Sequence, residues 1–92
     1  MAERAERIAR ILTAQFAPQV LRVEDESHRH AGHAGARPEG ETHFHVVLTS
    51  ARLAGLNRVA RSRLIHEALE TEFSNGLHAL RLTLRAPKEA AA

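Results

Sequence analysis

Cysteine, tryptophan and tyrosine are all absent from this 92-residue sequence, and phenylalanine occurs only three times. Without cysteine, the chain can form no disulfide, no thiolate nucleophile and no sulfur-based metal site of its own. Any metal that it holds must be bound by histidine or carboxylate, or shared with a partner that supplies sulfur. Because aromatic residues are so few, leucine, valine, isoleucine and alanine must fill the core of what we expect to be one small domain.

Long apolar runs are also missing, and no segment approaches the roughly 20 apolar residues that a membrane-spanning helix requires. The opening stretch, MAERAERIARILTAQF, contains Glu3 and Glu6 and no continuous apolar run, so we do not expect a signal peptide. The expected protein is soluble and cytoplasmic, with no membrane partner. Its net charge of +2 is slight, so the overall charge is weak support for a nucleic-acid partner.

Sequence signatures of catalysis are absent as well. The chain has no G-x-S-x-G nucleophile elbow and no P-loop pattern. Its clustered carboxylates, residues 24–26, lie at the end of a predicted strand, where successive side chains point in opposite directions. We therefore expect that the chain is not an enzyme.

The apolar pattern predicts the element order helix, strand, strand, helix pair, strand. Apolar side chains recur at helical spacing over residues 8–16, and QVLRVEDES and THFHVVLTS have the alternation typical of strands. A helical turn, a break near Gly55 and a longer helix follow, and LHALRLTL forms a third strand.

The connections between these elements predict the sheet. Two strands joined by a loop should be antiparallel, whereas a strand reached through a helical crossover should be parallel to its neighbour. The expected fold is α/β, a three-stranded mixed sheet with helices on one face. Asn57 should cap the long helix, and Asn75-Gly76 should end it. We place the core of the single domain at about residues 4–86 and expect residues 87–92 to form a disordered tail.

Histidine is the residue that the sequence has in abundance, and five of the seven histidines lie in DESHRHAGHAGARPEGETHFHV. His28, His30 and His33 form an H-x-H-x-x-H cluster in a glycine-containing loop. Such a cluster could hold zinc, nickel or copper by itself, or its members could simply decorate a polar loop. His78 stands alone at the start of the third strand, which by itself is a weak signal for metal ligation.

The remaining histidines have more ordinary interpretations. His43 and His45 lie on the strand face opposite Phe44. We expect His43 to position the hairpin through hydrogen bonds and His45 to be exposed. His66 falls in the long helix, where a structural role is expected.

Four pieces of the chain, taken together, resemble the BolA family. These are DES with a His-bearing loop, ETHFHVVLTSARLAGL, RSRLIHEALETEF and LHALRLTLRAP, which span about residues 8–87 in the family's order. The resemblance implies a fold similar to the type II KH domain, with the order α-β-β-α-α-β. One departure is Arg61-Ser62-Arg63, where the family often has Arg-His-Arg, so any role of that histidine is absent here.

The resemblance also implies a function. BolA-like proteins pair with monothiol glutaredoxins and share a 2Fe–2S cluster to which the partner brings its cysteine and glutathione. On this chain the ligands map to His78 and His30, with His33 and His28 as alternates. The implied protein is a non-catalytic adaptor in iron–sulfur cluster trafficking or iron-linked regulation and iron homeostasis. Alone, it would hold no cluster and would be a monomer or weak homodimer.

A run of arginines suggests an alternative function. No acid occurs between residues 51 and 66, whereas Glu67, Glu70 and Glu72 crowd the far end of the same predicted helix. This order is opposite to the one that the helix dipole favours, so it indicates an anionic partner such as phosphate, a glutathione carboxylate or an acidic protein surface. The candidate anion-binding residues are Arg58, Arg61 and Arg63.

The alternative function is a small DNA-binding transcriptional regulator that uses this arginine-rich helix. The G-x-x-G loop with which a KH domain clamps a nucleic-acid backbone is incomplete here, because the corresponding residues, 55–58, read Gly-Leu-Asn-Arg. Aromatic residues that could stack on bases are scarce. Any DNA binding is therefore expected to be mainly electrostatic, with weak sequence discrimination.

Overall fold

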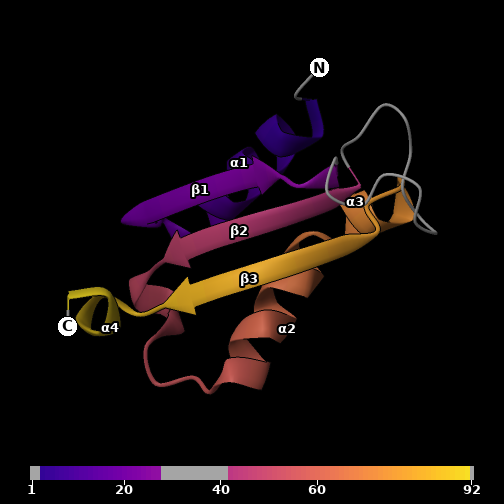
Figure 1. The fold of residues 1–92 in the computed structure, drawn as a ribbon. Coiled ribbons are helices and arrows are strands. Elements are labelled where there is room, and N and C mark those ends of the chain that lie inside the picture. The colour runs from indigo at the N-terminus through magenta and orange to yellow at the C-terminus, as the bar shows by residue number, and fades with distance from the viewer. Residues whose placement is uncertain (1–2, 28–41, 92) are drawn as a thin grey trace.

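The computed structural model describes residues 3–27 and 42–91 and arranges them as one sheet backed by helices (Figure 1). The elements in chain order are α1 (Glu3–Phe16), β1 (Val20–Asp25), β2 (His43–Thr49), the 3-10 helix η2 (Ala51–Leu53), α2 (Arg58–Ala68), α3 (Glu70–Ser74), β3 (Ala79–Arg85) and α4 (Pro87–Ala91).

The sheet has the strand order β1-β2-β3, and its topology confirms the predicted one. β1 is antiparallel to β2, and β3, which arrives through the helical crossover, is parallel to β2. The helices α1, α2 and α3 lie on one side of the three strands, as Figure 1 shows, and none of these three helices covers the other, open face of the sheet. The fold is therefore the predicted α/β arrangement.

The core lies between the sheet and these helices. The α1 side chains Ile8, Leu12 and Phe16 recur on one helix face and are buried. Phe44, Val46 and Leu48 point inward from β2, as strand alternation requires. The helical crossover completes the core with Leu53, Ile65, Leu69 and Leu77.

The crossover begins as predicted but is broken in the middle. The Asn57 side-chain oxygen accepts a hydrogen bond from the Ala60 N–H (2.9 Å) and caps α2. The helix that we expected to run on to Asn75 is interrupted at the fully buried Leu69, whose φ of −103° and ψ of 16° lie outside helical geometry. Gly76, with a φ of 112°, provides the turn from α3 towards β3.

Glu72, which was predicted to lie with Glu67 and Glu70 at the far end of one long helix, lies instead in the separate helix α3. Glu72 is 3 % exposed and points towards α1. Its carboxylate accepts hydrogen bonds from Arg7 Nε (2.8 Å) and Nη2 (3.0 Å), and Arg4 Nη1 lies 3.5 Å from it. The hydrogen bonds from Arg7, above all, hold the pKa of the Glu72 carboxyl below its ordinary value of 4.5. An ion pair between the buried Glu72 carboxylate and the partly exposed Arg7 therefore joins α3 to α1.

The predicted disordered tail was also wrong over the part that the structure describes, because α4 forms there. Pro87 occupies the first turn, where its missing N–H has no helical partner to lose. The Glu89 carboxylate reaches back to the Ala86 N–H (3.0 Å), as in a capping box. It also accepts hydrogen bonds from Arg61 Nη1 (2.6 Å) and Nη2 (2.8 Å), so α4 is tied to α2.

None of the helices in the described ranges, 3–27 and 42–91, is long and apolar enough to cross a membrane.

Candidate functional site

His78 is an exposed side chain whose backbone is fixed at the start of β3. Its N–H donates to the carbonyl oxygen of Thr42 (2.8 Å), and the N–H of Ala79 donates to the same oxygen (3.1 Å). One carbonyl at the beginning of β2 therefore holds the beginning of β3. The result is an imidazole that faces solvent from a rigid strand end.

The histidine-rich segment, residues 28–41, is anchored beside His78 at both of its ends. The Ser27 hydroxyl oxygen accepts hydrogen bonds from the N–H groups of Thr42 (2.9 Å) and His43 (3.1 Å). The Ser27 N–H in turn donates to Asp25 Oδ1 (2.8 Å). Since Thr42 also binds the backbone of His78, the chain leaves and re-enters the sheet next to that residue. The candidate ligand His30 and its alternates His33 and His28 belong to this segment, which lies outside the described residues.

A second imidazole lies against His78. The ring centroids of His43 and His78 are 5.1 Å apart, with the planes tilted by 47°. His43 is 7 % exposed, and its Nδ1 lies 2.9 Å from Thr42 Oγ1. The sequence did not reveal this pair, because it depends on the parallel register that sets His43 opposite Ala79. The His43 N–H is bonded to Ser27 and its ring contacts the His78 ring, so His43 helps to hold His78 in place.

His45 was expected to be exposed, and this was wrong. Its side chain is 12 % exposed and spans the open face of the sheet. Nδ1 lies 3.1 Å from Glu24 Oε1 on β1, and Nε2 lies 2.9 Å from Thr83 Oγ1 on β3. His45 therefore links all three strands. His66 is exposed on α2, and its ring stacks on Phe73 with centroids 5.2 Å apart.

The described residues do not form a complete metal site, since no group of three or more His, Cys, Asp or Glu side chains among them could hold a metal ion. They do supply an accessible imidazole at the start of β3, that of His78. Neutral imidazole is a ligand that suits iron, including the iron of a 2Fe–2S cluster. The donor chemistry of the site thus fits an iron–sulfur cluster that receives its other ligands from elsewhere.

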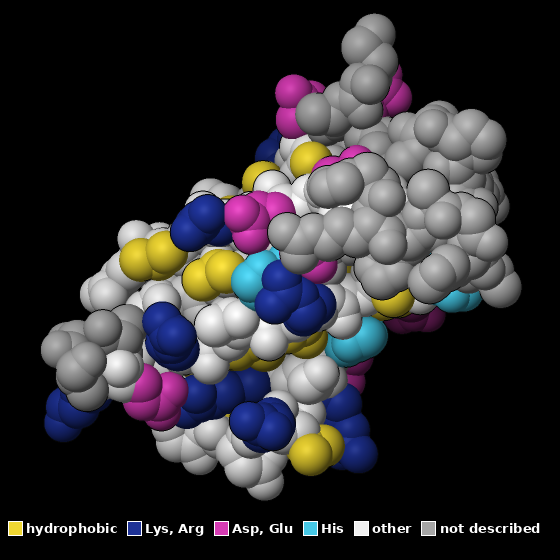
Figure 2. All heavy atoms as spheres, in the orientation of Figure 1, with side chains coloured by type: hydrophobic (Ala, Val, Ile, Leu, Met, Phe, Trp, Pro, Cys, Tyr) yellow, Lys and Arg dark blue, Asp and Glu magenta, His cyan; other side chains and the backbone are white. Residues whose placement is uncertain are grey.

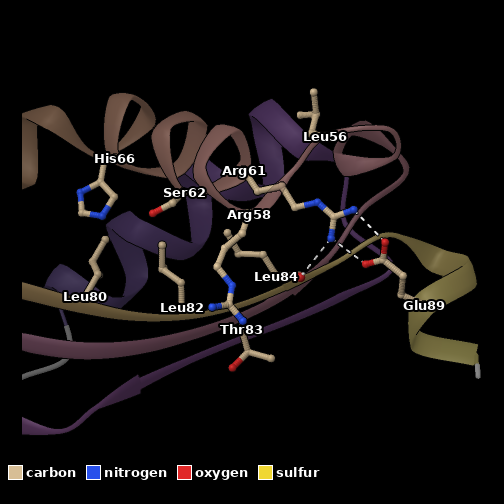
Figure 3. Close-up of a pocket in the computed structure, with 10 residues that line it drawn as sticks. All are labelled: Leu56, Arg58, Arg61, Ser62, His66, Leu80, Leu82, Thr83, Leu84 and Glu89. Atoms are coloured by element: carbon tan, nitrogen blue, oxygen red, sulfur yellow. Dashed lines mark hydrogen bonds and ion pairs between the residues drawn. The ribbon is translucent and has the colours of Figure 1, made fainter.

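The candidate anion-binding arginines are not equivalent. Arg58 and Arg63 are exposed, whereas Arg61 is engaged by Glu89 and its Nη1 also donates to the Leu84 carbonyl (3.4 Å). Arg61 and Arg58 line a groove of 860 Å³ between α2 and β3 (Figure 3). The structure therefore brings two of the three arginines to one groove and points the third elsewhere on the surface.

This fold and this site define a class of protein. A mixed sheet of three strands, backed by helices in this order, presents a histidine at the start of its last strand beside the ends of the hairpin loop. The family model described as BolA-like protein matches residues 12–89. The chain belongs to the BolA family.

Comparisons with individual proteins agree with this assignment. The chain is 42 % identical over 88 residues to the chloroplastic protein BOLA1 of Arabidopsis thaliana, with 94 % of this chain and 55 % of that protein covered. Among solved structures, it is similar to the BolA domain of SufE1 from Arabidopsis thaliana (TM-score 0.88, 39 % identity, 97 % and 98 % covered). It is also similar to BolA1 from Mus musculus (TM-score 0.80, 34 % identity, 96 % and 68 % covered).

The relatives differ in length from this chain. It spans 55 % of the Arabidopsis BOLA1 protein and 25 % of the SufE-like protein 1 of Arabidopsis thaliana, to which it is 40 % identical. An uncharacterised protein of Sinorhizobium sp is 44 % identical and is covered over 91 % of both chains. The similarity is thus to the BolA domain itself.

Proposed function

We propose that this chain forms a heterodimer with a monothiol glutaredoxin and shares a 2Fe–2S cluster with it. His78 supplies one imidazole, and the histidine-rich segment supplies a second, from His30 or its alternates His33 and His28. The glutaredoxin cysteine and glutathione supply two sulfurs. The complex acts in cluster trafficking or iron-linked regulation, and the chain itself catalyses no reaction.

One observation carries this proposal: the two ends of the histidine-rich segment are pinned beside the exposed His78. Ser27 and Thr42 flank the segment, and Thr42 binds the backbone N–H of His78. The described residues that flank the segment thus lie next to the start of β3, which supports a ligand set drawn from both parts of the chain. Family membership supports the same function.

The composition supports a shared cluster. A 2Fe–2S cluster needs four protein or thiol ligands, and a chain without cysteine cannot provide thiolates. Two imidazoles opposite two sulfurs give a ligand set of the Rieske kind, which raises the reduction potential because neutral imidazole donates less charge than thiolate.

Direct DNA binding by the arginine-rich helix is less well supported. Arg61 is occupied by Glu89, so a phosphate would have to displace a carboxylate that already makes two short hydrogen bonds. Within the described part of the chain, no Phe, Tyr or Trp lines the groove beside α2. The groups on which a base could stack there are the His66 imidazole and the arginine guanidinium groups.

The proposal is tested by recording visible absorption and circular dichroism spectra of the cluster as the heterodimer forms. The chain is mixed with a cluster-loaded monothiol glutaredoxin, and the variants His78→Ala, His30→Ala and His66→Ala are compared. We expect His78→Ala to abolish the spectrum of the heterodimeric cluster, because the neighbouring His43 ring is buried and engaged by Thr42 and so should not replace the exposed ligand. His30→Ala should only shift or weaken it, since His33 or His28 can substitute.

His66→Ala is the matched control, because this exposed imidazole lies on α2 and should leave the spectrum unchanged. The opposite pattern, in which loop variants lose metal and His78→Ala has no effect, would indicate a metal site in the loop alone. An intact heterodimer spectrum with His78→Ala refutes the ligand assignment.

A further inference from the structure

β3 is an edge strand with backbone groups directed away from the sheet. It pairs with β2 on one side, and no strand in the described part of the chain pairs with it on the other. The Ala79 N–H and the Arg85 carbonyl are bonded towards β2, to Thr42 and Ser50. Since backbone polar groups alternate in direction along a strand, Leu80, Leu82 and Leu84 present their N–H and C=O groups to the outer edge.

The same three leucines line the groove between β3 and α2. Their side chains are half-buried, because α2 covers them only in part. Figure 3 shows Leu80 and Leu82 rising from β3 towards Ser62 and His66, while Arg58 reaches from α2 towards the strand. The outer edge of β3 thus borders an apolar surface with a cation above it.

Arginines lie on both sides of this edge. On the groove side are Arg58 and Arg61, and on the open face of the sheet are Arg81 and Arg85, which the register places opposite His45 and Thr49. Figure 2 shows Lys and Arg side chains gathered over this part of the molecule. Glu26 engages Arg81 at 2.7 Å, as Glu89 engages Arg61, whereas no acid among the described residues forms an ion pair with Arg58 or Arg85.

Glu89 shows that the groove can bind a carboxylate. A carboxylate from the short helix α4 sits at one end of the groove and bonds Arg61 through both of its oxygens. This is the geometry in which a guanidinium recognises a carboxylate. An incoming acidic side chain would find the same kind of partner in Arg58, which lies farther along the same groove.

We propose that the outer edge of β3 binds an extended acidic peptide, which adds to the sheet as a fourth strand. The peptide backbone bonds the outward N–H and C=O groups of Leu80 and Leu82. Alternate peptide side chains point to opposite faces of the sheet, so carboxylates meet Arg58 on the groove side and Arg85 on the open side. The apolar leucine surface accepts small aliphatic side chains between the carboxylates. This site is separate from the proposed cluster site and does not depend on it.

A single-stranded nucleic acid fits the same surface less well. Its phosphates would suit the arginines, but its bases cannot form the regular ladder of N–H and C=O bonds that an added strand forms along β3. The other edge strand, β1, provides an internal comparison, because it carries Glu24 and Asp25 and should repel an acidic strand.

The test uses an acetylated and amidated peptide of two Glu-Glu-Val-Glu repeats, about eight residues long, so that it spans β3 and carries carboxylates on both faces of the added strand, with Val between carboxylates on one face. Binding to the full chain is followed by backbone amide shifts in NMR spectra at low salt. We expect shifts at Leu80, Leu82 and Leu84 and none along β1. Arg58→Ala should weaken binding by about fivefold, which is the effect of losing one surface charge contact. Arg52→Ala, at an exposed arginine of η2 outside the groove, should leave the affinity unchanged.

Two further probes separate the proposal from its competitors. The same peptide with N-methylated backbone amides should bind about tenfold more weakly, because it cannot form the strand ladder. Equal binding of the methylated peptide overturns the proposal, as does equal affinity of the Arg58→Ala and Arg52→Ala variants. An oligothymidine of the same length that binds more tightly than the peptide, and loses affinity with Arg58→Ala, overturns it in favour of nucleic acid.

Discussion

The Ser27 hydroxyl accepts hydrogen bonds from two backbone N–H groups, those of Thr42 and His43, and all three residues are buried. Replacing Ser27 by Ala leaves both donors without this acceptor. A buried donor without a partner costs about 1–3 kcal/mol. We therefore expect Ser27→Ala to lower the free energy of unfolding by about 2 kcal/mol, measured by urea denaturation.

A second serine provides the control for this measurement. The Ser74 hydroxyl donates to the Glu70 carbonyl (3.2 Å) at an exposed position. Water can replace that bond, so Ser74→Ala should change the free energy of unfolding by less than about 0.5 kcal/mol. If the two variants lose the same stability, the two hydrogen bonds that the Ser27 hydroxyl accepts do not stabilise the fold more than the exposed hydrogen bond of Ser74.

The pKa of the Glu89 carboxyl can be measured by titration, and the contacts of this carboxyl predict how the pKa should change in a variant. The hydrogen bonds from Arg61, and next the one from the Ala86 N–H, lower its pKa to about 2 from the ordinary 4.5. In an NMR titration of the side-chain carboxyl, Arg61→Ala should raise this pKa. The rise should stop short of the ordinary value, because the bond from Ala86 remains.

Arg63→Ala is the matched variant, since Arg63 lies two residues away on the same helix and is exposed. It should leave the pKa of Glu89 unchanged. An equal rise with Arg63→Ala would mean that general positive charge, rather than the contact with Arg61, controls the carboxyl.

At the scale of whole elements, the contact between α1 and α3 depends on the buried Glu72. Because the pKa of Glu72 is lower in the folded chain than in the unfolded one, its contribution is fully present above about pH 4.5 and is lost as the pH falls through the folded-state value. We expect Glu72→Gln to lower the free energy of unfolding at pH 7 by about 1–3 kcal/mol. In urea denaturation, the difference from the natural chain should shrink as the pH is lowered from 5 towards 3.

Glu67→Gln is the control for that series, because Glu67 is exposed near the end of α2. Its effect should stay within about 0.5 kcal/mol at neutral pH. A Glu72→Gln deficit that is independent of pH would show that packing, and not the charge on Glu72, accounts for the loss.

The sequence correctly predicted the elements whose position depends on a local pattern of apolar residues. The apolar positions of α1 and the alternation of β2 follow from helical and strand periods, and the crossover rule then set the direction of β3. The break at Leu69 and the inward turn of Glu72 depend on α1, which is distant in sequence. The helix α4 was missed although Pro87 and Glu89 have helix-starting spacing, because a short helix near a chain end is held by a contact, here with Arg61, that no local pattern reveals.

On the proposed ligand set, the whole molecule provides two of the four ligands that a 2Fe–2S cluster needs. We expect that the isolated chain, reconstituted with iron and sulfide, holds no stable 2Fe–2S cluster by visible absorption, since it brings imidazoles but no thiolate. Addition of a monothiol glutaredoxin and glutathione should produce the spectrum. A stable cluster on the chain alone would contradict the proposal that the cluster is shared with a partner.

The candidate site was predictable to different degrees. His78 and the histidine-rich segment were identified from their residues and from the family resemblance. The support around His78 was not, because Ser27, Thr42 and His43 become neighbours only through the registers of the sheet. The expected exposure of His45 failed for the same reason, as Glu24 and Thr83 come from two other strands.

The hydrogen bond from the Thr42 N–H to the Ser27 hydroxyl joins the two residues that flank the histidine-rich segment, and this has a consequence for engineering. Chain length between two fixed points is inexpensive, since doubling a flexible loop costs roughly 0.6 kcal/mol in closure entropy. The bond between Ser27 and Thr42 fixes the two points at which the segment starts and ends. If the proposed function holds, a grafted segment with different donor atoms should change the metal preference beside His78, and the same bond should hold the ends of the grafted segment in place.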